Sequence, residues 1–213
     1  NVPTEILAND ILLDLTATST RPKSTPSNKL RILYTGNVGR AQGLENAIEA
    51  VRIAANEGVE LTLRIVGGGA HLAMIKELAA DLPYVEFLSQ SRREDLDVHH
   101  CWSDTLLVHL KDWLPLNETV PSKLFEAVAS GRHVTLAANG ESVELLEESG
   151  AGDAVPAMNP QALADLWAEL ARNRERLNVG SIGIDWLRKT QAAADPAETF
   201  VDFLDKARAR RIA

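Results

Sequence analysis

The sequence predicts an α/β protein built on a Rossmann-like, doubly wound parallel sheet of about six strands, with helices on both faces and a helical C-terminal tail. Apolar runs of strand length alternate six times with longer amphipathic stretches, and several runs end in a glycine-rich turn. This alternation is typical of βαβ units. The expected strands cover 30–36, 60–67, 84–88, 104–110, 132–138 and 152–156, and the expected helices cover 41–56, 70–80, 92–102, 121–130, 142–149 and 160–173.

The spacing of apolar residues supports the helices. In 41–56, residues such as Leu44, Ala47 and Ile48 form one stripe at intervals of three and four, while the charged residues lie off it. The segment 70–80 repeats the pattern. Both segments therefore have one face to bury against a sheet.

The chain is expected to divide into three parts. Residues 17–28 are rich in Thr, Ser and Pro and lack hydrophobic periodicity, which indicates a linker. We therefore expect an N-terminal segment and interdomain linker at 1–29, a Rossmann-like domain at 30–175 and a helical tail at 176–213. Because the chain opens on Asn1 without an initiator Met or a signal peptide, we expect it to be a piece of a longer protein.

The composition excludes several classes of protein. The 213 residues are 45% hydrophobic, which allows a sizeable core. A net charge of −8 provides no chain-wide basic surface for nucleic acid, so a phosphate-bearing ligand must be met by local groups. Cys101, the single cysteine, cannot form an internal disulfide, and no apolar run reaches the roughly 18 to 20 residues of a membrane span.

The loops that follow the strands are the places to look for a ligand, because ligands of open parallel sheets bind beyond the carboxyl ends of the strands. The first loop, 35–43, contains Gly36, Gly39 and Gly43 together with the cation of Arg40. Its glycine spacing differs from the dinucleotide fingerprint, and a turn without a ligand explains it equally well. The loops at 66–71, with Gly67, and at 89–95 are explained more simply as a tight turn and a solvated helix start.

The loop NETVPSKLFEA at 117–127 has more specific features. Pro121 suits the first turn of a helix, and Thr119 or Ser122 can cap that helix. The start of a helix carries unpaired N–H groups and roughly half a positive charge, to which Lys123 adds a full one. This combination favours a diphosphate.

Two carboxylates flank this helix start. Glu126, one turn inside the helix, can accept hydrogen bonds from two vicinal hydroxyls such as those of a ribose, and Glu118 could reach sugar hydroxyls on the other side of the phosphates. The simpler alternative is a surface ion pair between Lys123 and Glu126, with Glu118 a solvated loop residue.

The next loop, 137–152, favours the ligand-binding alternative. Gly140 follows a strand, and Glu141 begins another helix whose free N–H groups would face the same crevice. His109 lies at the end of its strand beside this crevice, although a lone histidine there is more often a packed residue than a catalytic one.

These segments resemble the retaining family-4 glycosyltransferases. The stretch from Glu118 to Glu126 resembles their Glu-x7-Glu motif, and ETVPSKLFEAVASGRHV followed by NGESVELLEESGAGDAVPAMNPQAL resembles their nucleotide-sugar-binding half. YTGNVGRAQGLENAIEA and VHLKD are similar to a subgroup that builds bacterial surface polysaccharides. The resemblance covers about residues 30–170 and implies the C-terminal domain of a two-domain GT-B enzyme.

The resemblance implies a role for each matching residue. Glu118 would bind the donor sugar and Lys123, with Ser122, the diphosphate, which makes Glu118 and Lys123 the expected catalytic residues. Glu126 would bind the ribose. The remaining expected donor-binding residues are Gly36, Asn37, Arg40, Gly67 and His109 around the first loops, Leu88 and Ser89 at the base, and Gly140 and Glu141 at the sugar and phosphates.

Two departures from the family pattern concern the site. Asn37 and Gln42 stand where the family places an arginine and a lysine, which leaves more of the phosphate charge to Lys123 or Arg40. Thr119-Val120-Pro121 replaces the usual Gly-Phe-Gly, as in the subgroup. No Asp-x-Asp motif stands at a suitable strand end, so metal-independent transfer without a cofactor is expected.

The expected function is sugar transfer from a nucleotide diphosphate sugar, with UDP as the expected nucleotide, to a glycan or lipid-linked acceptor. The acceptor would be held by an N-terminal domain that this chain lacks, which would leave the chain inactive by itself. We expect the full-length enzyme to be cytoplasmic and to reach the inner membrane face through its acceptor. A GT-B-fold UDP-sugar epimerase and a non-catalytic nucleotide-binding or protein-interaction module remain as alternatives.

Overall fold

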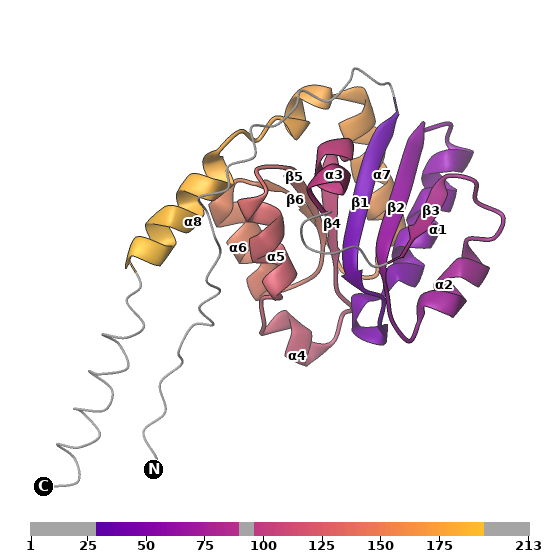
Figure 1. Ribbon diagram of the computed structural model, residues 1–213, viewed down its shortest axis with the longest axis horizontal. Coiled ribbons are helices and arrows are strands. Elements are labelled where there is room, and N and C mark those ends of the chain that lie inside the picture. The colour runs from indigo at the N-terminus through magenta and orange to yellow at the C-terminus, as the bar shows by residue number, and fades with distance from the viewer. Residues whose placement is uncertain (1–28, 90–95, 194–213) are drawn as a thin grey trace, which may run out of the picture.

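The computed structural model describes residues 29–89 and 96–193 (Figure 1). Its centre is a six-stranded sheet in the order β3-β2-β1-β4-β5-β6, in which every neighbouring pair is parallel. The strands are β1 Leu30–Asn37, β2 Leu61–Gly68, β3 Val85–Leu88, β4 Thr105–His109, β5 His133–Ala137 and β6 Gly152–Val155. The predicted doubly wound sheet of about six strands is confirmed.

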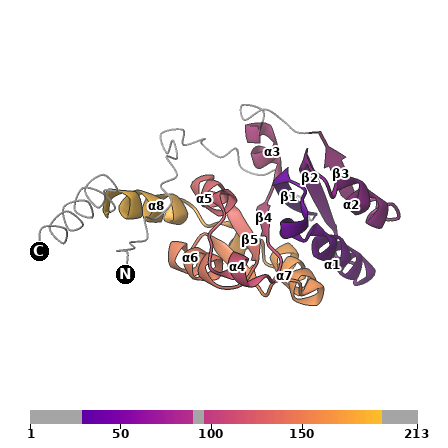
Figure 2. The ribbon, with the colours of Figure 1, turned by 90° about the horizontal axis from the view of Figure 1, so that it is seen from below.

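Helices cover both faces of the sheet, as predicted (Figure 2). They are α1 Leu44–Asn56, α2 Leu72–Leu78, α3 Leu96–Trp102, α4 Leu114–Asn117, α5 Ser122–Ala129, α6 Glu141–Ser149, α7 Pro160–Arg172 and α8 Ile182–Ala193, with the 3-10 turns η1 Arg40–Gln42 and η3 Arg174–Leu177. The C-terminal helical stretch is confirmed as far as α8, and the rest of the predicted tail, from residue 194 on, lies outside the described residues.

Two apolar clusters hold the layers together. The first packs α1, α2 and α7 against one face of the sheet, with Trp167 of α7 fully buried in it. The second packs α5, α6 and α8 against the other face, where Leu124 of α5 is fully buried. Successive side chains of a strand point to opposite faces, so Ile32 joins the first cluster while Leu33 joins the second.

The two largest differences between the predicted and the observed elements lie near the sheet's carboxyl edge. The helix expected at 41–56 starts at Leu44, because Gly43 has a φ of 57° and interrupts the backbone between η1 and α1. The short helix α4 lies in a stretch that was predicted as loop. Of the helix expected at 92–102, residues 92–95 lie outside the described part of the chain.

The order of the strands creates a switch point between β1 and β4. The chain runs outward from β1 to β2 and β3, then returns to the opposite side of β1 to form β4, β5 and β6. The loops that leave the carboxyl ends of β1 and β4 therefore diverge in opposite directions, which opens a crevice between them.

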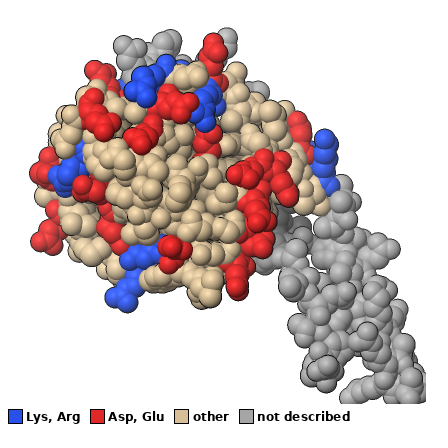
Figure 3. Space-filling model, turned by 180° about the vertical axis from the view of Figure 1, so that it is seen from behind, with Lys and Arg blue, Asp and Glu red and all other residues tan. Residues whose placement is uncertain are grey.

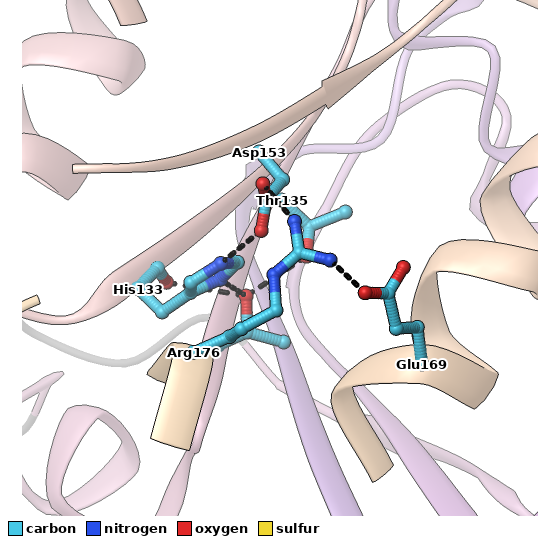
Figure 4. Close-up of polar contacts among 6 residues, drawn as sticks. His133, Thr135, Asp153, Glu169 and Arg176 are labelled. Atoms are coloured by element: carbon cyan, nitrogen blue, oxygen red, sulfur yellow. Dashed lines mark hydrogen bonds and ion pairs between the residues drawn. The ribbon is translucent and has the colours of Figure 1, made fainter. Parts of the chain in front are cut away.

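A buried polar network joins the strands near their amino ends (Figure 4). His133 of β5 lies with Nε2 2.9 Å from Asp153 Oδ2 and Nδ1 2.8 Å from Thr105 Oγ1. Thr105 Oγ1 in turn lies 2.9 Å from Thr135 Oγ1. Thr105 is 0% exposed and His133 is 1% exposed, so this network holds β4, β5 and β6 together and offers no nucleophile to a ligand.

Two arginines of η3 tie the C-terminal part of the chain to the same edge. Arg174 lies 2.9 Å from Asp104, a nearly buried carboxylate that also pairs with Arg31 at 3.1 Å. Arg176 forms an ion pair with Asp153. The turn after α7 is therefore fastened to residues at the start of β4 and β6.

The surface agrees with the acidic composition. Figure 3 shows the face behind Figure 1, on which Asp and Glu groups gather in a band and Lys and Arg groups form smaller clusters. Helix α6 contributes four exposed glutamates, at positions 141, 144, 147 and 148. None of the helices in the described part of the chain is both long and apolar enough to cross a membrane.

Candidate functional site

A pocket of about 280 Å³ opens at the switch point. Its floor is the carboxyl half of β1 and β4, one wall is the start of α5, and another wall is α3. Of the residues predicted for the site, it brings together Asn37, His109, Ser122, Lys123 and Glu126. Residues that are more than 80 positions apart in the sequence thus line one hollow, where an open parallel sheet binds its ligands.

The wall formed by α5 presents a helix N-terminus to the pocket. Pro121 is the residue before the helix, with extended backbone, and no side chain caps the first turn. The predicted caps, Thr119 and Ser122, are therefore not used; Thr119 Oγ1 instead donates to the carbonyl of Pro115 at 3.2 Å. The first N–H groups of α5 are left without a side-chain acceptor, which suits an anion.

Lys123 and Glu126 form an ion pair on the pocket side of α5. Lys123 Nζ lies 2.6 Å from Glu126 Oε2, and each side chain is 41% exposed. The simple surface-pair alternative is thus real, but an exposed pair one turn apart contributes only about 0.2–0.5 kcal/mol. A ligand with a phosphate and vicinal hydroxyls can replace this pair at little cost.

Two glycines shape the space next to Lys123. Gly36, with a φ of 132°, lies against the lysine stem, since a Cβ at this position would be 3.2 Å from Lys123 Cε. Gly67 pairs with Gly36 across β1 and β2, and a Cβ on Gly67 would overlap the Gly36 carbonyl oxygen at 1.9 Å. Gly36 and Gly67 therefore serve close packing at the strand ends, and neither lines the pocket.

His109 is a buried neutral residue at the end of β4. Its Nε2 lies 2.8 Å from Asn46 Nδ2, so the amide donates and the imidazole accepts. Burial lowers the pKa of His109 to about 4, although the Gln42 backbone and the Glu45 carboxylate act in the opposite direction. At neutral pH this histidine supplies no positive charge to the pocket.

The first loop is held by its own amides. The Gln42 side chain accepts from the backbone N–H of Gly39 at 3.1 Å and from Asn37 Nδ2 at 3.4 Å. Asn37 and Gln42 both line the pocket, whereas Arg40 in η1 does not. The positions at which the resembled family carries its cations thus offer neutral hydrogen-bonding groups here.

A second lysine, missed in the sequence, lies at the same edge. Lys111 Nζ is 2.7 Å from Glu45 Oε1 of α1, and the backbone N–H of Lys111 donates to the Ala41 carbonyl at 2.8 Å. Burial would raise the pKa of Glu45, but the hydrogen bond and charge of Lys111 lower it overall. The VHLKD stretch resembles the polysaccharide-building subgroup, yet no spacing rule links Lys111 to Glu45 across 66 positions.

Helix α3 supplies a wall that sequence reasoning missed. Leu96 and His100 line the pocket, whereas Leu88 and Ser89, the residues predicted for the base, do not. β3 is an edge strand of the sheet, separated from the switch point by β2 and β1. Burial is the main cause that lowers the pKa of His100, and Lys123 and Glu126 are near enough for their charges to act on it.

Glu118 and the start of α6 form a second group beside the pocket. Glu118 is the exposed residue that follows α4, and Gly140 precedes α6, which begins at Glu141. A Cβ on Gly140 would lie 2.0 Å from the Asn117 carbonyl oxygen, so the two segments touch. None of the three predicted residues lines the pocket at the switch point, and Gly140 instead lines a shallow hollow next to α6.

In the described part of the chain, no group of three or more His, Cys, Asp or Glu residues is placed to hold a metal ion. Metal-independent transfer stays a prediction.

The topology and the pocket define a Rossmann-like α/β domain whose ligand crevice lies at the switch point of a parallel sheet. Comparison with protein families identifies one family within this class of domains. The family described as "Glycosyl transferases group 1" matches residues 17–181, which is most of the chain. The chain belongs to this family.

Individual relatives agree with the family and the fold. The probable glycosyltransferase WbjE of Pseudomonas aeruginosa is 29% identical over 157 residues, which cover 70% of this chain and 37% of WbjE. The crystal structure of Anabaena Alr3699/HepE with UDP and glucose superposes with a TM-score of 0.61 at 18% identity, over 84% of this chain and 48% of that one. The C-terminal domain of the Francisella tularensis glycosyl transferase LpcC superposes with a TM-score of 0.59 at 19% identity, over 75% and 85%.

These likenesses show the GT-B type of Rossmann-like fold. The chain spans little more than a third of the length of its relative WbjE.

Proposed function

We propose that this chain is the donor-binding half of a retaining glycosyltransferase of family 4, which transfers the sugar of a UDP-sugar to a glycan or a lipid-linked acceptor. The single observation that carries the proposal is the pocket at the switch point, in which a helix N-terminus, Lys123 and Glu126 converge. The Anabaena relative, whose crystal structure contains UDP and glucose, supports a UDP-sugar as the ligand.

The diphosphate would lie at the start of α5. The free N–H groups of this helix and the Lys123 ammonium can stabilise the negative charge that develops as the sugar leaves. Because Asn37 and Gln42 are neutral, we infer that Lys123 meets more of that charge than in related enzymes. A diphosphate that is stabilised in this way needs no general acid to protonate it.

The nucleoside would extend from α5 towards α3. Glu126 lies one turn inside α5 and can accept hydrogen bonds from the two ribose hydroxyls. Leu96 and His100 of α3 then offer an apolar contact and a neutral imidazole to the base. We therefore propose that the base contacts the wall formed by α3, and not Leu88 and Ser89 at the sheet's edge.

The donor sugar would lie between Glu118 and the start of α6. Both segments flank the pocket on the side of β5, and the N-terminus of α6 adds a second positive helix end. We propose that an N-terminal domain, outside this chain, holds the acceptor on the opposite side of the sugar. The similarity to the isolated C-terminal domain of LpcC supports this division.

Calorimetric titration of the chain with UDP tests the proposal. We expect UDP to bind, and Glu126→Ala to weaken it by about tenfold or more, since a carboxylate that accepts two hydroxyls makes charge-assisted hydrogen bonds. Glu77→Ala, which changes an exposed glutamate of α2 far from the pocket, is the matched control. No heat with UDP at millimolar concentration would favour a non-catalytic interaction module, and UDP binding unchanged by Glu126→Ala would refute the ribose contact.

A further inference from the structure

Asp112 connects two loops at the carboxyl edge of the sheet. Its Oδ1 accepts one hydrogen bond from Asn117 Nδ2 at 3.1 Å and another from Asn139 Nδ2 at 2.9 Å. Asn117 is the last residue of α4, and Asn139 lies in the loop between β5 and α6. One carboxylate oxygen therefore holds the end of α4 and the approach to α6 at a common point.

The connection continues to a third loop. Asn139 Oδ1 accepts from the backbone N–H of Ala157, in the segment between β6 and α7, at 3.2 Å. Asn139 thus uses its amide nitrogen on Asp112 and its amide oxygen on Ala157, which fixes the orientation of its side chain.

The backbone carbonyls on both sides of Glu118 also contact the start of α6. The carbonyl of Asn117 packs so closely on Gly140 that a Cβ there would overlap it. The Ser142 hydroxyl, buried in the first turn of α6, donates to the carbonyl of Thr119 at 3.0 Å. The residues before and after Glu118 are therefore both held by the start of α6.

The electrostatics of Asp112 suit this arrangement. The hydrogen bonds from Asn117 and then from Asn139 lower the pKa of the Asp112 carboxyl, so it stays ionised at neutral pH. An ionised carboxylate accepts and does not donate, which is what two amide N–H groups require. Asp112 is exposed, so these bonds contribute little to global stability while they still restrict the local geometry.

We propose that Asp112 is a positioning residue, which sets Glu118 against the first turn of α6 so that both can hold the donor sugar. This inference rests on the proposed function, because it assigns the sugar to Glu118 and to the start of α6. Asp112 acts through Asn117 and Asn139 and does not itself need to touch the sugar.

The test compares UDP with two UDP-sugars, UDP-glucose and UDP-N-acetylglucosamine, by calorimetry. The ratio of the Kd for UDP to the Kd for the better UDP-sugar measures the contribution of the sugar. Asp112→Ala is expected to lower this ratio about tenfold, the size of an ordinary coupling between neighbouring groups, while the Kd for UDP stays within about twofold. Asp112→Asn retains an acceptor oxygen and should keep part of the ratio.

A double-mutant cycle with Glu118 separates positioning from a general loss of structure. If Asp112 acts by placing Glu118, then Asp112→Ala should have little further effect on the ratio once Glu118 is already Ala. Asp185→Ala, which changes an exposed aspartate of α8 paired with Ser181, is the matched control. The melting temperature of each variant is recorded alongside.

Three results would overturn the proposal. They are a ratio unchanged by Asp112→Ala, an equal loss of affinity for UDP and for the UDP-sugar, and an unmutated chain that binds neither sugar more tightly than UDP. Failure of the underlying function gives a different result, because UDP would then not bind or would be insensitive to Glu126→Ala.

Discussion

The buried histidine at the end of β4 predicts how the stability of this protein depends on pH. Burial lowers the pKa of His109 to about 4, below its usual 6.5, because the folded state disfavours a charged imidazole. The unfolded chain therefore binds a proton more readily than the folded chain between these values. The contribution of His109 to stability is complete above pH 6.5 and falls as the pH falls towards 4.

The size of the effect follows from the two pKa values. For one group with a pKa of 6.5 unfolded and about 4 folded, linkage gives a loss of about 2 kcal/mol in the free energy of unfolding between pH 7 and pH 5. By pH 4 the loss is about 3 kcal/mol. This is a large part of the roughly 5–15 kcal/mol that stabilises a typical domain.

Urea unfolding followed by circular dichroism at pH 7, 6 and 5 measures this loss. His109→Gln is the informative variant, because a glutamine does not titrate and its oxygen can still accept from Asn46 Nδ2. The pKa of His100 is also lowered by burial, but His100 is present in both proteins and its effect cancels in the comparison. We expect the variant to lose about 2 kcal/mol less than the parent between pH 7 and pH 5. An equal decline in both proteins would refute the reasoning.

Three further outcomes are expected. Lys123→Ala should weaken UDP more than uridine in calorimetry, since its ammonium meets the phosphates, and equal losses would remove Lys123 from the phosphate site. Gly140→Ala should lower the free energy of unfolding by about 2 kcal/mol or more, because its φ is 70° and its Cβ would overlap Asn117, while a chain as stable as the parent in urea would contradict that contact. The hydrogen bond from His133 lowers the pKa of Asp153 in the folded state. The stability that ionised Asp153 contributes is therefore present above the pKa of the unfolded state and is lost as the pH falls through the pKa of the folded state. Asp153→Asn should flatten the loss of stability below about pH 4, and an unchanged loss would contradict this contribution.

The fold was accessible from the sequence because it depends on periodicity. The apolar spacing of each strand-length run and each amphipathic stripe, such as the one that contains Leu44 and Ile48, indicates which residues are buried, whichever element they pack against. Glycine-dependent boundaries were harder, since Gly43 interrupts a segment whose apolar spacing continues. Helix α4 was missed because a four-residue helix is too short to show a period.

The candidate site was accessible only in part. Lys123 and Glu126 were found because their positions at a helix start have chemical meaning within one short segment. Leu96 and His100 were missed because only the strand order places α3 above the switch point, and that order is not written in any local pattern. The contact of Asp112 with Asn139 joins residues 27 positions apart through side chains that have no characteristic spacing.

The turn η3 determines where this chain can be divided. A chain that ended at residue 175, the predicted boundary of the domain, would keep Arg174 but remove Arg176, the partner of Asp153 and Glu169. A cut at residue 173 would also leave the nearly buried Asp104 with Arg31 as its remaining arginine. Shortened versions intended for ligand screening or crystallisation should therefore extend past Leu177, and those that end earlier should be expressed in poorer yield than those that retain η3.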